Sequence, residues 1–262
     1  MIDKTDKLYD LYQFFTSDNK DYLKNLAVDN VIFGYHEKEL KVLLVNNPYT
    51  EPWMLPGGYI KKTEDVETAA SRVALQRTGL RDLFLKQFKV FSTPGRNKDS
   101  HFTPALLSEL TGKKIDKNHW LFDQIATVGF YTLVEFSKVD VDGSTHDEKV
   151  KWFDINHLPS LLHDHNKIIK EALQALRHHI YHYPIGYELL PEKFTLPDIR
   201  ILYQTILGKE MDDRNFARKL TSLGIIEKLE EIKHTRGHRS PYLYSFNKEM
   251  YNQALDHGVF FS

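Results

Sequence analysis

Apolar residues in the first half of the chain gather in short runs that polar stretches separate. Two such runs, 27–35 (AVDNVIFGY) and 40–46 (LKVLLVN), flank the polar residues of 36–39. Short runs rich in β-branched and aromatic residues favour strands, so the pattern predicts a β-hairpin. Further strands are expected at 83–91 and 125–136, and the polar segment GKKIDKNHW between them looks like an insertion.

Two longer segments have the character of helices. The segment 63–78 opens with acidic residues and stops before Gly79, and acids favour the positive start of a helix while glycine ends it. The segment 166–183 repeats apolar residues at the spacing of one helix face. These residues are Ile169, Leu173, Leu176 and Ile180. Strands and helices together predict an α+β domain.

The last third of the chain shows a different order of elements. A helix is expected to begin after Thr195, which can cap it, and to end at Gly208, and a second helix is expected over 213–223. Two strands, 225–229 and 241–246, then enclose a loop rich in lysine, arginine and histidine. Helix, helix, strand, basic loop and strand is the order of a winged helix.

Proline and glycine mark the boundary between these two parts. Pro184, Gly186 and Pro191 interrupt the chain after the long helix and predict a linker there. We therefore expect four segments along the chain. They are an N-terminal helical leader over 1–25, an α+β domain over 26–183, the linker over 184–193 and a winged-helix domain over 194–262.

The composition narrows the class of protein. The chain has 262 residues, of which 41% are apolar and 27% charged, as is ordinary for a globular protein of two domains. The absence of cysteine excludes disulfides and thiolate metal sites and agrees with the cytoplasm, where we expect the protein. The N-terminus lacks the features of a signal peptide, and no run of about 18 apolar residues predicts a membrane helix, so no membrane partner is expected. With a net charge of -1, a nucleic-acid surface must be a local patch.

The segment after the predicted hairpin carries the most informative motif. It reads WMLPGG over 53–58 and is followed by Glu64, Arg72 and the pair Gly79-Leu80. This resembles the Nudix signature, in which glycine, glutamate, arginine and a final glycine keep fixed distances across a loop, a helix and a loop. The residues that fall on that spacing without a gap are Gly58, Glu64, Arg72, Gly79 and Leu80.

The same motif lacks the carboxylates on which Nudix chemistry depends. Three glutamates on the signature helix hold Mg²⁺ or a similar hard cation, which neutralises phosphate charge and activates water. Positions i, i+3 and i+4 share a helix face, but here they are Val73, Gln76 and Arg77. Valine offers no ligand, glutamine a neutral oxygen and arginine a permanent positive charge. We therefore expect no catalytic residues, no cofactor and no metal, and Glu64 is the one candidate ligand if a metal binds.

Other residues of this region are candidates for binding a small-molecule effector. Pro94, Gly95 and Arg96 partly match a segment of Nudix proteins that handle ADP-ribose, and Arg96 could pair with a phosphate or bond to a sugar. A solvated loop arginine is the ordinary alternative, and for Glu64 the alternative is to complement the helix dipole. The candidate effector site comprises Gly57, Gly58, Glu64, Arg72 and Arg96.

The second helix of the predicted winged helix has a basic side. Phe216, Leu220 and Leu223 are expected to face inward, so the polar residues between them point outward together. With the basic loop they form the candidate DNA-binding surface. It comprises Arg214, Asn215, Arg218 and Lys219 on the helix and Lys233, Arg236 and Arg239 on the loop. Arginine and asparagine can read base edges, whereas loop lysines and arginines suit phosphates.

Taken over most of its length, the chain resembles the Nudix-related transcriptional regulators. The matching motifs are Pro184-Ile185-Gly186, Leu190-Pro191, Phe194-Thr195-Leu196 and Arg214-Asn215-Phe216. The resemblance implies a Nudix-like mixed sheet flanked by helices with a C-terminal winged helix-turn-helix domain. It also implies a homodimeric repressor of NAD-related or sugar metabolism, which leaves double-stranded operator DNA when ADP-ribose, a related nucleotide or a pentose binds.

A second function stays open on the sequence. A Nudix hydrolase acting on ADP-ribose or another nucleoside diphosphate derivative would need Mg²⁺ and would use its C-terminal domain for dimerisation. Glu64 favours this alternative, and the residues at 73, 76 and 77 count against it. The leading hypothesis is therefore the regulator.

Overall fold

The structure, a computed structural model, describes residues 21–46, 52–98, 103–112, 114–138, 149–233 and 240–258. The chain divides into two compact units, which are treated one at a time below. Unit 1 takes its described residues from 1–32, 42–132 and 140–172, and unit 2 takes them from 33–41, 133–139 and 173–262.

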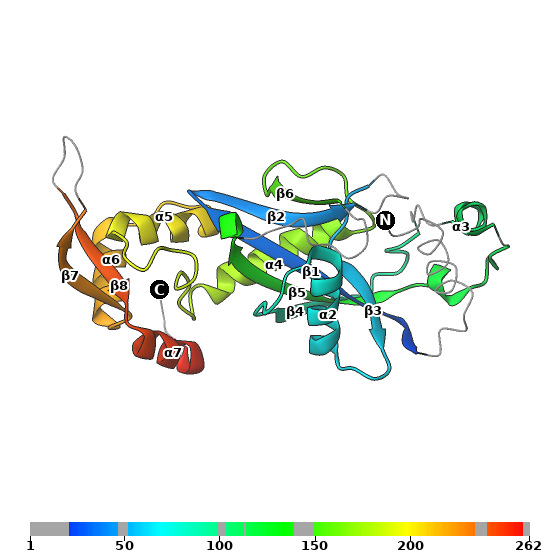
Figure 1. Cartoon of the computed structure of the whole chain (residues 1–262), viewed down its shortest axis with the longest axis horizontal. Helices are drawn as coiled ribbons and strands as arrows, with labels where there is room; N and C mark the ends of the chain where they lie inside the picture. Colours follow the sequence, from blue (N-terminus) through cyan, green and yellow to red (C-terminus); the bar gives the residue numbers. More distant parts are fainter. Residues whose placement is uncertain are drawn as a thin grey trace, which may run out of the picture. The chain divides into compact units, whose positions relative to one another are not determined.

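Six strands within the described residues form the larger of two sheets, which Figure 1 shows in blue to green. Its order is β4-β5-β1-β2-β6, and β3 pairs with β1. The strands are β1 (Tyr22–His36), β2 (Glu39–Asn46), β3 (Gly57–Lys61), β4 (Lys86–Phe91), β5 (Ala126–Glu135) and β6 (Lys149–Asp154). The predicted hairpin is confirmed as β1 and β2, and the strands predicted at 83–91 and 125–136 are confirmed as β4 and β5.

Strand β3 differs from the expectation of a loop before the signature helix. Its first two residues are glycines, which are depleted in strands and hide the pattern. In the structure the strand is antiparallel to β1, with Gly57 opposite Asp29 and Gly58 opposite Val28. The signature glycines therefore lie at the start of a strand, against the middle of β1. Strand β6 was likewise not predicted.

The signature helix is α2 (Val66–Thr78). It begins three residues later than predicted because Asp65 is the cap, and its side chain accepts a hydrogen bond from the Thr68 amide. It ends at Gly79, which has a left-handed φ of 77° that glycine adopts without strain. One side of α2 packs on β1, β3 and β5. The buried residues of this cluster are Val28, Ile60, Ala69, Ala70, Val73, Val128 and Phe130.

The polar insertion expected at 112–120 is anchored to unit 1. A helix that the sequence did not predict, α3 (Pro104–Thr111), precedes it, and a single turn of 3₁₀ helix, η1 (Trp120–Phe122), follows it. Ile115 and Trp120 of this region are buried together with Leu107 of α3. Tyr59 of β3 packs against this cluster, so the segment contacts the sheet although its composition indicates only a loop.

Helix α4 (His165–His179) confirms the long amphipathic helix, and unit 2 continues from its second half. The C-terminal elements follow in the order predicted for a winged helix. They are α5 (Leu196–Leu207), α6 (Asp213–Ser222), β7 (Ile226–Ile232) and β8 (Tyr242–Phe246). A further helix, α7 (Lys248–His257), was not predicted. Strands β7 and β8 pair with each other, and Phe194 forms an isolated antiparallel bridge to Tyr244 of β8.

The start of α5 shows how local sequence fixes this domain. Thr195 caps the helix and Asp198 bonds back to the Thr195 amide at 2.8 Å, so the two residues form a capping box. Tyr203 of α5 then packs on Phe216 of α6, with ring centroids 5.0 Å apart. The predicted cap and the predicted inward position of Phe216 are both confirmed.

The N-terminal prediction differs from the structure at its end. Residues 1–20 of the expected helical leader lie outside the described residues, and residues 22–25 belong to β1 rather than to a helix. No helix within the described ranges has the length and apolar character needed to cross a membrane.

Candidate functional site

The two signature glycines are required by close packing. A side chain at Gly57 would collide with Oδ1 of Asp29, and a Cβ at Gly58 would lie 2.9 Å from Cγ2 of Val73. The start of β3 therefore lies closer to β1 and α2 than a residue with a side chain would allow. The predicted effector residues Gly57 and Gly58 thus form the junction between sheet and signature helix.

Glu64 and Arg72 bind each other. Nε of Arg72 donates to Oε2 of Glu64 at 2.9 Å, and the same carboxylate accepts the Lys61 amide at 2.8 Å. The hydrogen bond from Arg72 lowers the pKa of Glu64, whose side chain is only 8% exposed. Arg72 also donates to the Tyr59 carbonyl and to Oε1 of Gln76, each at 2.9 Å. The pair holds the segment between β3 and α2 against α2, and each charged group is bound by its partner within the protein.

The three positions expected to present metal ligands do not share one surface. Val73 is 2% exposed and belongs to the core under the sheet, so the expectation that 73, 76 and 77 face a common site is wrong for Val73. The side-chain oxygen of Gln76 already accepts from Arg72. Arg77 donates from Nη1 to the Gly57 carbonyl at 2.9 Å and approaches Sδ of Met54 at 3.5 Å.

These residues do not fit a magnesium ion. A hard cation requires several carboxylate or carbonyl oxygens at short range, and here one acid is bound by Arg72 and an arginine lies on the loop carbonyl. Within the part of the chain that the structure describes, no group of three or more histidine, aspartate or glutamate side chains could hold a metal.

Arg96 is buried, so the alternative of a solvated loop arginine is wrong. Its side chain is 4% exposed and binds Asp164 with two nitrogens, Nη2 to Oδ1 at 2.7 Å and Nε to Oδ2 at 3.2 Å. Nη1 reaches the Ile125 carbonyl at 3.3 Å, and Nη2 lies 3.7 Å from Oδ2 of Asp29. Arg96 therefore joins its loop to β1 and to the turn before α4.

The residues around Arg96 were missed by the sequence analysis. His165 is buried, accepts the Leu55 amide on Nδ1 at 3.0 Å, and has its Nε2 3.7 Å from Oδ1 of Asp29. Burial lowers the pKa of His165, and burial lowers that of His163 to about 4. The sequence signal that could have found them is the run His163-Asp164-His165 at the start of a predicted helix. The loop, β1, the Arg96 segment and this turn thus meet at one buried polar cluster in unit 1.

Helix α6 of unit 2 carries four of the predicted DNA-binding residues. Asn215 and Arg218 are exposed, and Nη2 of Arg218 donates to Oδ1 of Asn215 at 2.9 Å. Phe216 and Leu220 are buried, as predicted, so the polar side of the helix points to solvent. Lys219 is half-buried, and Arg214 lies in the first turn of α6.

The basic loop is described only at its edge. Lys233 lies 3.7 Å from Oδ2 of Asp198 in α5. Arg236 and Arg239 lie outside the described residues, so their assignment to phosphate contacts stays a prediction.

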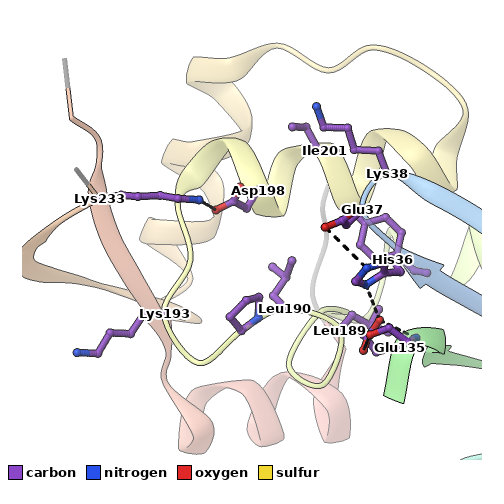
Figure 2. A pocket seen from close by; sticks show the side chains of 13 residues that line it. His36, Glu37, Lys38, Glu135, Leu189, Leu190, Lys193, Asp198, Ile201 and Lys233 are labelled. Carbon is purple, nitrogen blue, oxygen red and sulfur yellow. Dashed lines mark hydrogen bonds and ion pairs between the residues drawn. The ribbon is translucent and has the colours of Figure 1, made fainter. Parts of the chain in front are cut away.

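Unit 2 also contains a cavity of about 830 Å³, which the sequence did not predict and which Figure 2 shows. Leu189 and Leu190 line its centre, and Figure 2 shows Lys233 reaching toward Asp198 on its wall. The rest of the wall comes from the short turn η2 (Phe136–Lys138) and from the turn between β1 and β2. On this wall, Nδ1 of His36 and Oε1 of Glu135 form a hydrogen bond of 2.8 Å. Its volume lies in the range of small-molecule sites. The rim carries lysines and acids alike, so it favours no single class of ligand.

Known protein families match both parts of the chain. Residues 23–176 match the family model of the NUDIX domain, and residues 186–246 match that of the NrtR DNA-binding winged helix domain. The α+β fold with a Nudix-like sheet and a C-terminal winged helix is thereby confirmed.

Individual relatives agree with this division. The chain is 25% identical over 234 residues to a protein of Acinetobacter baylyi named ADPR responsive transcriptional repressor NtrR, covering 87% of this chain and 84% of that protein. It is 27% identical over 152 residues to the ADP-ribose pyrophosphatase of Methanocaldococcus jannaschii, covering 57% of this chain and 73% of that protein.

Solved structures show the same fold over most of the chain. Shewanella oneidensis NrtR, crystallised with a 27mer DNA, superimposes with a TM-score of 0.66 at 23% identity, covering 90% of this chain and 98% of that one. A MutT/nudix family protein of Enterococcus faecalis gives a TM-score of 0.60 at 19% identity, covering 94% and 100%. Because the NUDIX match spans more than half of its residues, this chain belongs to the NUDIX domain family.

Proposed function

We propose that the protein is a DNA-binding transcriptional repressor whose Nudix domain senses a small-molecule effector. The observation that carries this proposal is the presence, on one chain, of a NUDIX domain and an NrtR DNA-binding winged helix domain. The exposed Asn215 and Arg218 support it, since such residues on a winged helix can reach base edges.

The effector proposed first is ADP-ribose. A relative that shares most of the chain is named as responsive to ADPR, and a second is named as an ADP-ribose pyrophosphatase. A related nucleotide or a pentose is the alternative outcome of the same ligand panel. The effector acts through its differential affinity for the free and the DNA-bound protein.

The proposal includes two further properties. The repressor is a homodimer, and it acts in the cytoplasm. A two-fold dimer requires a pseudo-palindromic operator with half-sites about one helical turn, or a multiple of it, apart. Hydrolysis is not part of the proposal, because the residues at 73, 76 and 77 and the Glu64–Arg72 pair leave no set of metal ligands. Steady turnover of ADP-ribose with Mg²⁺ at about 1 s⁻¹ or faster would favour the hydrolase instead.

DNA binding is tested by fluorescence anisotropy with duplexes from upstream of the protein's own gene and its neighbours. We expect tighter binding to one of these duplexes than to random duplex at the same salt, and weaker binding when ADP-ribose is added. Arg218→Ala should cost about 1–3 kcal/mol and relax specificity at one operator position. Arg236→Ala should weaken binding to every sequence and reduce the salt slope by about one unit.

Arg81→Ala is the matched control, because Arg81 is an exposed arginine of unit 1. Equal affinity for upstream and random duplex, or unchanged affinity in both C-terminal variants, would show that the winged helix has another role.

A further inference from the structure

We infer that Asn215 and Arg218 recognise the operator as one unit, in which Asn215 positions Arg218 and Arg218 binds a guanine. The inference rests on the proposed function and specifies how the protein reads its DNA. Residue type alone would give each side chain its own base, adenine for the asparagine and guanine for the arginine. The hydrogen bond between the two side chains changes this assignment, and the operator position that they contact requires guanine.

The packing of α6 fixes the side of the helix on which both residues lie. Phe216 and Leu220 are buried, and the ring centroid of Phe216 lies 5.0 Å from that of Tyr203 in α5. At about 100° per residue, Asn215 and Arg218 lie on the side of the helix away from this contact, and both are exposed. The two polar side chains therefore point to solvent together, and a rotation of α6 that turned them inward would expose Phe216.

Both residues lie in the first two turns of α6, which has ten residues, Asp213–Ser222. In helix-turn-helix proteins, the N-terminal residues of the second helix contact base edges in the major groove. The backbone amide of Asn215 is bound by the side chain of Asp212 at 2.8 Å. At this position the helix therefore offers DNA the side chain of Asn215 and not its backbone N–H.

The hydrogen bond between the two side chains fixes the orientation of the Asn215 amide. Nη2 of Arg218 donates to Oδ1 of Asn215 at 2.9 Å. A guanidinium has only N–H donors, so the atom that faces it must be the carbonyl oxygen and not the amide nitrogen. The residues are three positions apart, a spacing at which side chains of a helix meet. The helix itself thus brings the two groups together.

This arrangement makes the pair a surface of hydrogen-bond donors. The guanidinium of Arg218 is always charged and carries five N–H groups, of which the bond to Asn215 uses one. The amide adds its own NH₂ group. Oδ1 of Asn215 retains a second lone pair, but a donor that used it would lie beside the positive charge of Arg218. The pair therefore suits a base edge that offers acceptors.

Guanine is the base whose major-groove edge offers two acceptors and no donor. It presents N7 and O6, which an arginine binds with two N–H groups, whereas adenine presents N7 beside the N6 amino group. An asparagine that reads adenine accepts from this amino group and donates to N7. In this protein such a contact would place the amino group next to the guanidinium of Arg218, so that two donors face each other. The pair therefore selects guanine over adenine.

The test uses the upstream duplex that the anisotropy titrations identify, with each base pair changed in turn. We expect a guanine in each half-site whose replacement by adenine weakens binding of the wild-type chain about tenfold to a hundredfold. The preference for guanine at that position should disappear in Arg218→Ala. In Asn215→Ala it should fall to about a third of its wild-type value or less, and no preference for adenine should be lost elsewhere.

Modified bases and a conservative variant separate base reading from a structural role. 7-Deazaguanine at that position lacks N7 and should weaken binding, whereas inosine keeps N7 and O6 and should bind as guanine does. Asn215→Asp keeps an oxygen for Arg218, so the ratio of guanine to adenine affinity should stay near that of the wild type. The added negative charge should weaken binding to every duplex alike. Arg81→Ala should keep the wild-type preference at every position.

Any of three results would overturn the inference. In the first, Asn215→Ala loses a preference for adenine, which means that Asn215 reads a base of its own. In the second, Asn215→Ala keeps the full preference for guanine, so Asn215 does not position Arg218. In the third, Arg218→Ala keeps every base preference. These results leave specific DNA binding intact and reject this inference alone, whereas binding no tighter than to random duplex rejects the repressor and this inference with it.

Discussion

Helices α2 and α6 each begin at an aspartate cap and each carry arginine along one side, yet they use it differently. Asp65 caps α2 and Asp212 caps α6, both through a hydrogen bond of 2.8 Å to a backbone amide. The arginines of α2 fold back on unit 1, where Arg72 binds Glu64 and Arg77 binds the Gly57 carbonyl. On α6, Arg218 is exposed and is bound by its neighbour Asn215.

The difference lies in what surrounds each helix. Helix α2 is covered by its loop, so an arginine there meets carboxylates and carbonyls that are already fixed, and removing one partner leaves the other buried. An exposed arginine on α6 is surrounded by water, and its contact with Asn215 contributes little to stability. Fixed internal partners suit the exact positioning of a small ligand, whereas a solvated side chain is available to a partner as large as DNA.

The largest effect is expected from placing a carboxylate at Val73. Val73→Glu should lower the free energy of unfolding by about 4 kcal/mol, because the new charge would lie in the core against Gly58 and the sheet. Urea denaturation measures this. Ser71→Glu, at an exposed position of the same helix, should change it by less than about 0.5 kcal/mol.

This outcome bears directly on the metal site. Restoring Val73→Glu, Gln76→Glu and Arg77→Glu together should then destabilise unit 1 before it recovers any metal binding. A stable Val73→Glu variant would instead mean that α2 can rotate this position toward the surface, and the contrast with α6 would weaken.

A smaller effect is expected from removing the arginines themselves. Arg72→Ala should destabilise the protein by about 3 kcal/mol, since Glu64, at 8% exposure, would lose the partner that neutralises it. Arg218→Ala should alter the stability by less than about 0.5 kcal/mol. Thermal unfolding of the two variants beside the wild type checks the pair. Equal destabilisation would show that Arg218 also supports the fold.

The smallest effect is a dependence on pH. The hydrogen bond from Arg72 holds the pKa of Glu64 below its ordinary value of 4.5. The pair therefore contributes stability above that value, and the contribution is lost as the pH falls through the lowered pKa of the folded protein. Urea denaturation from pH 6 down to about pH 3 should show a shallower decline for Glu64→Gln than for the wild type. Parallel curves would mean that the pair does not couple protonation to folding.

Local sequence patterns predicted the elements that depend on interactions between residues close together in the chain. The hairpin of β1 and β2, the amphipathic α4 and the helix cap at Thr195 follow from residues within a few positions of one another. Elements without such a signal were missed. Helix α3 has eight residues, too few for a clear period, and β3 opens with two glycines.

The sequence alone determined the spacing of the signature, the loss of its glutamates and the order of a winged helix, because these depend on residue type and on distance along the chain. Only the tertiary structure decided where the side chains point. Val73 turns into the core because α2 presents that side to β1, β3 and β5. Arg96 is buried because Asp164, 68 residues away in the chain, meets it at 2.7 Å. Such partners are set by how distant segments pack, and no period or motif in the sequence records that packing.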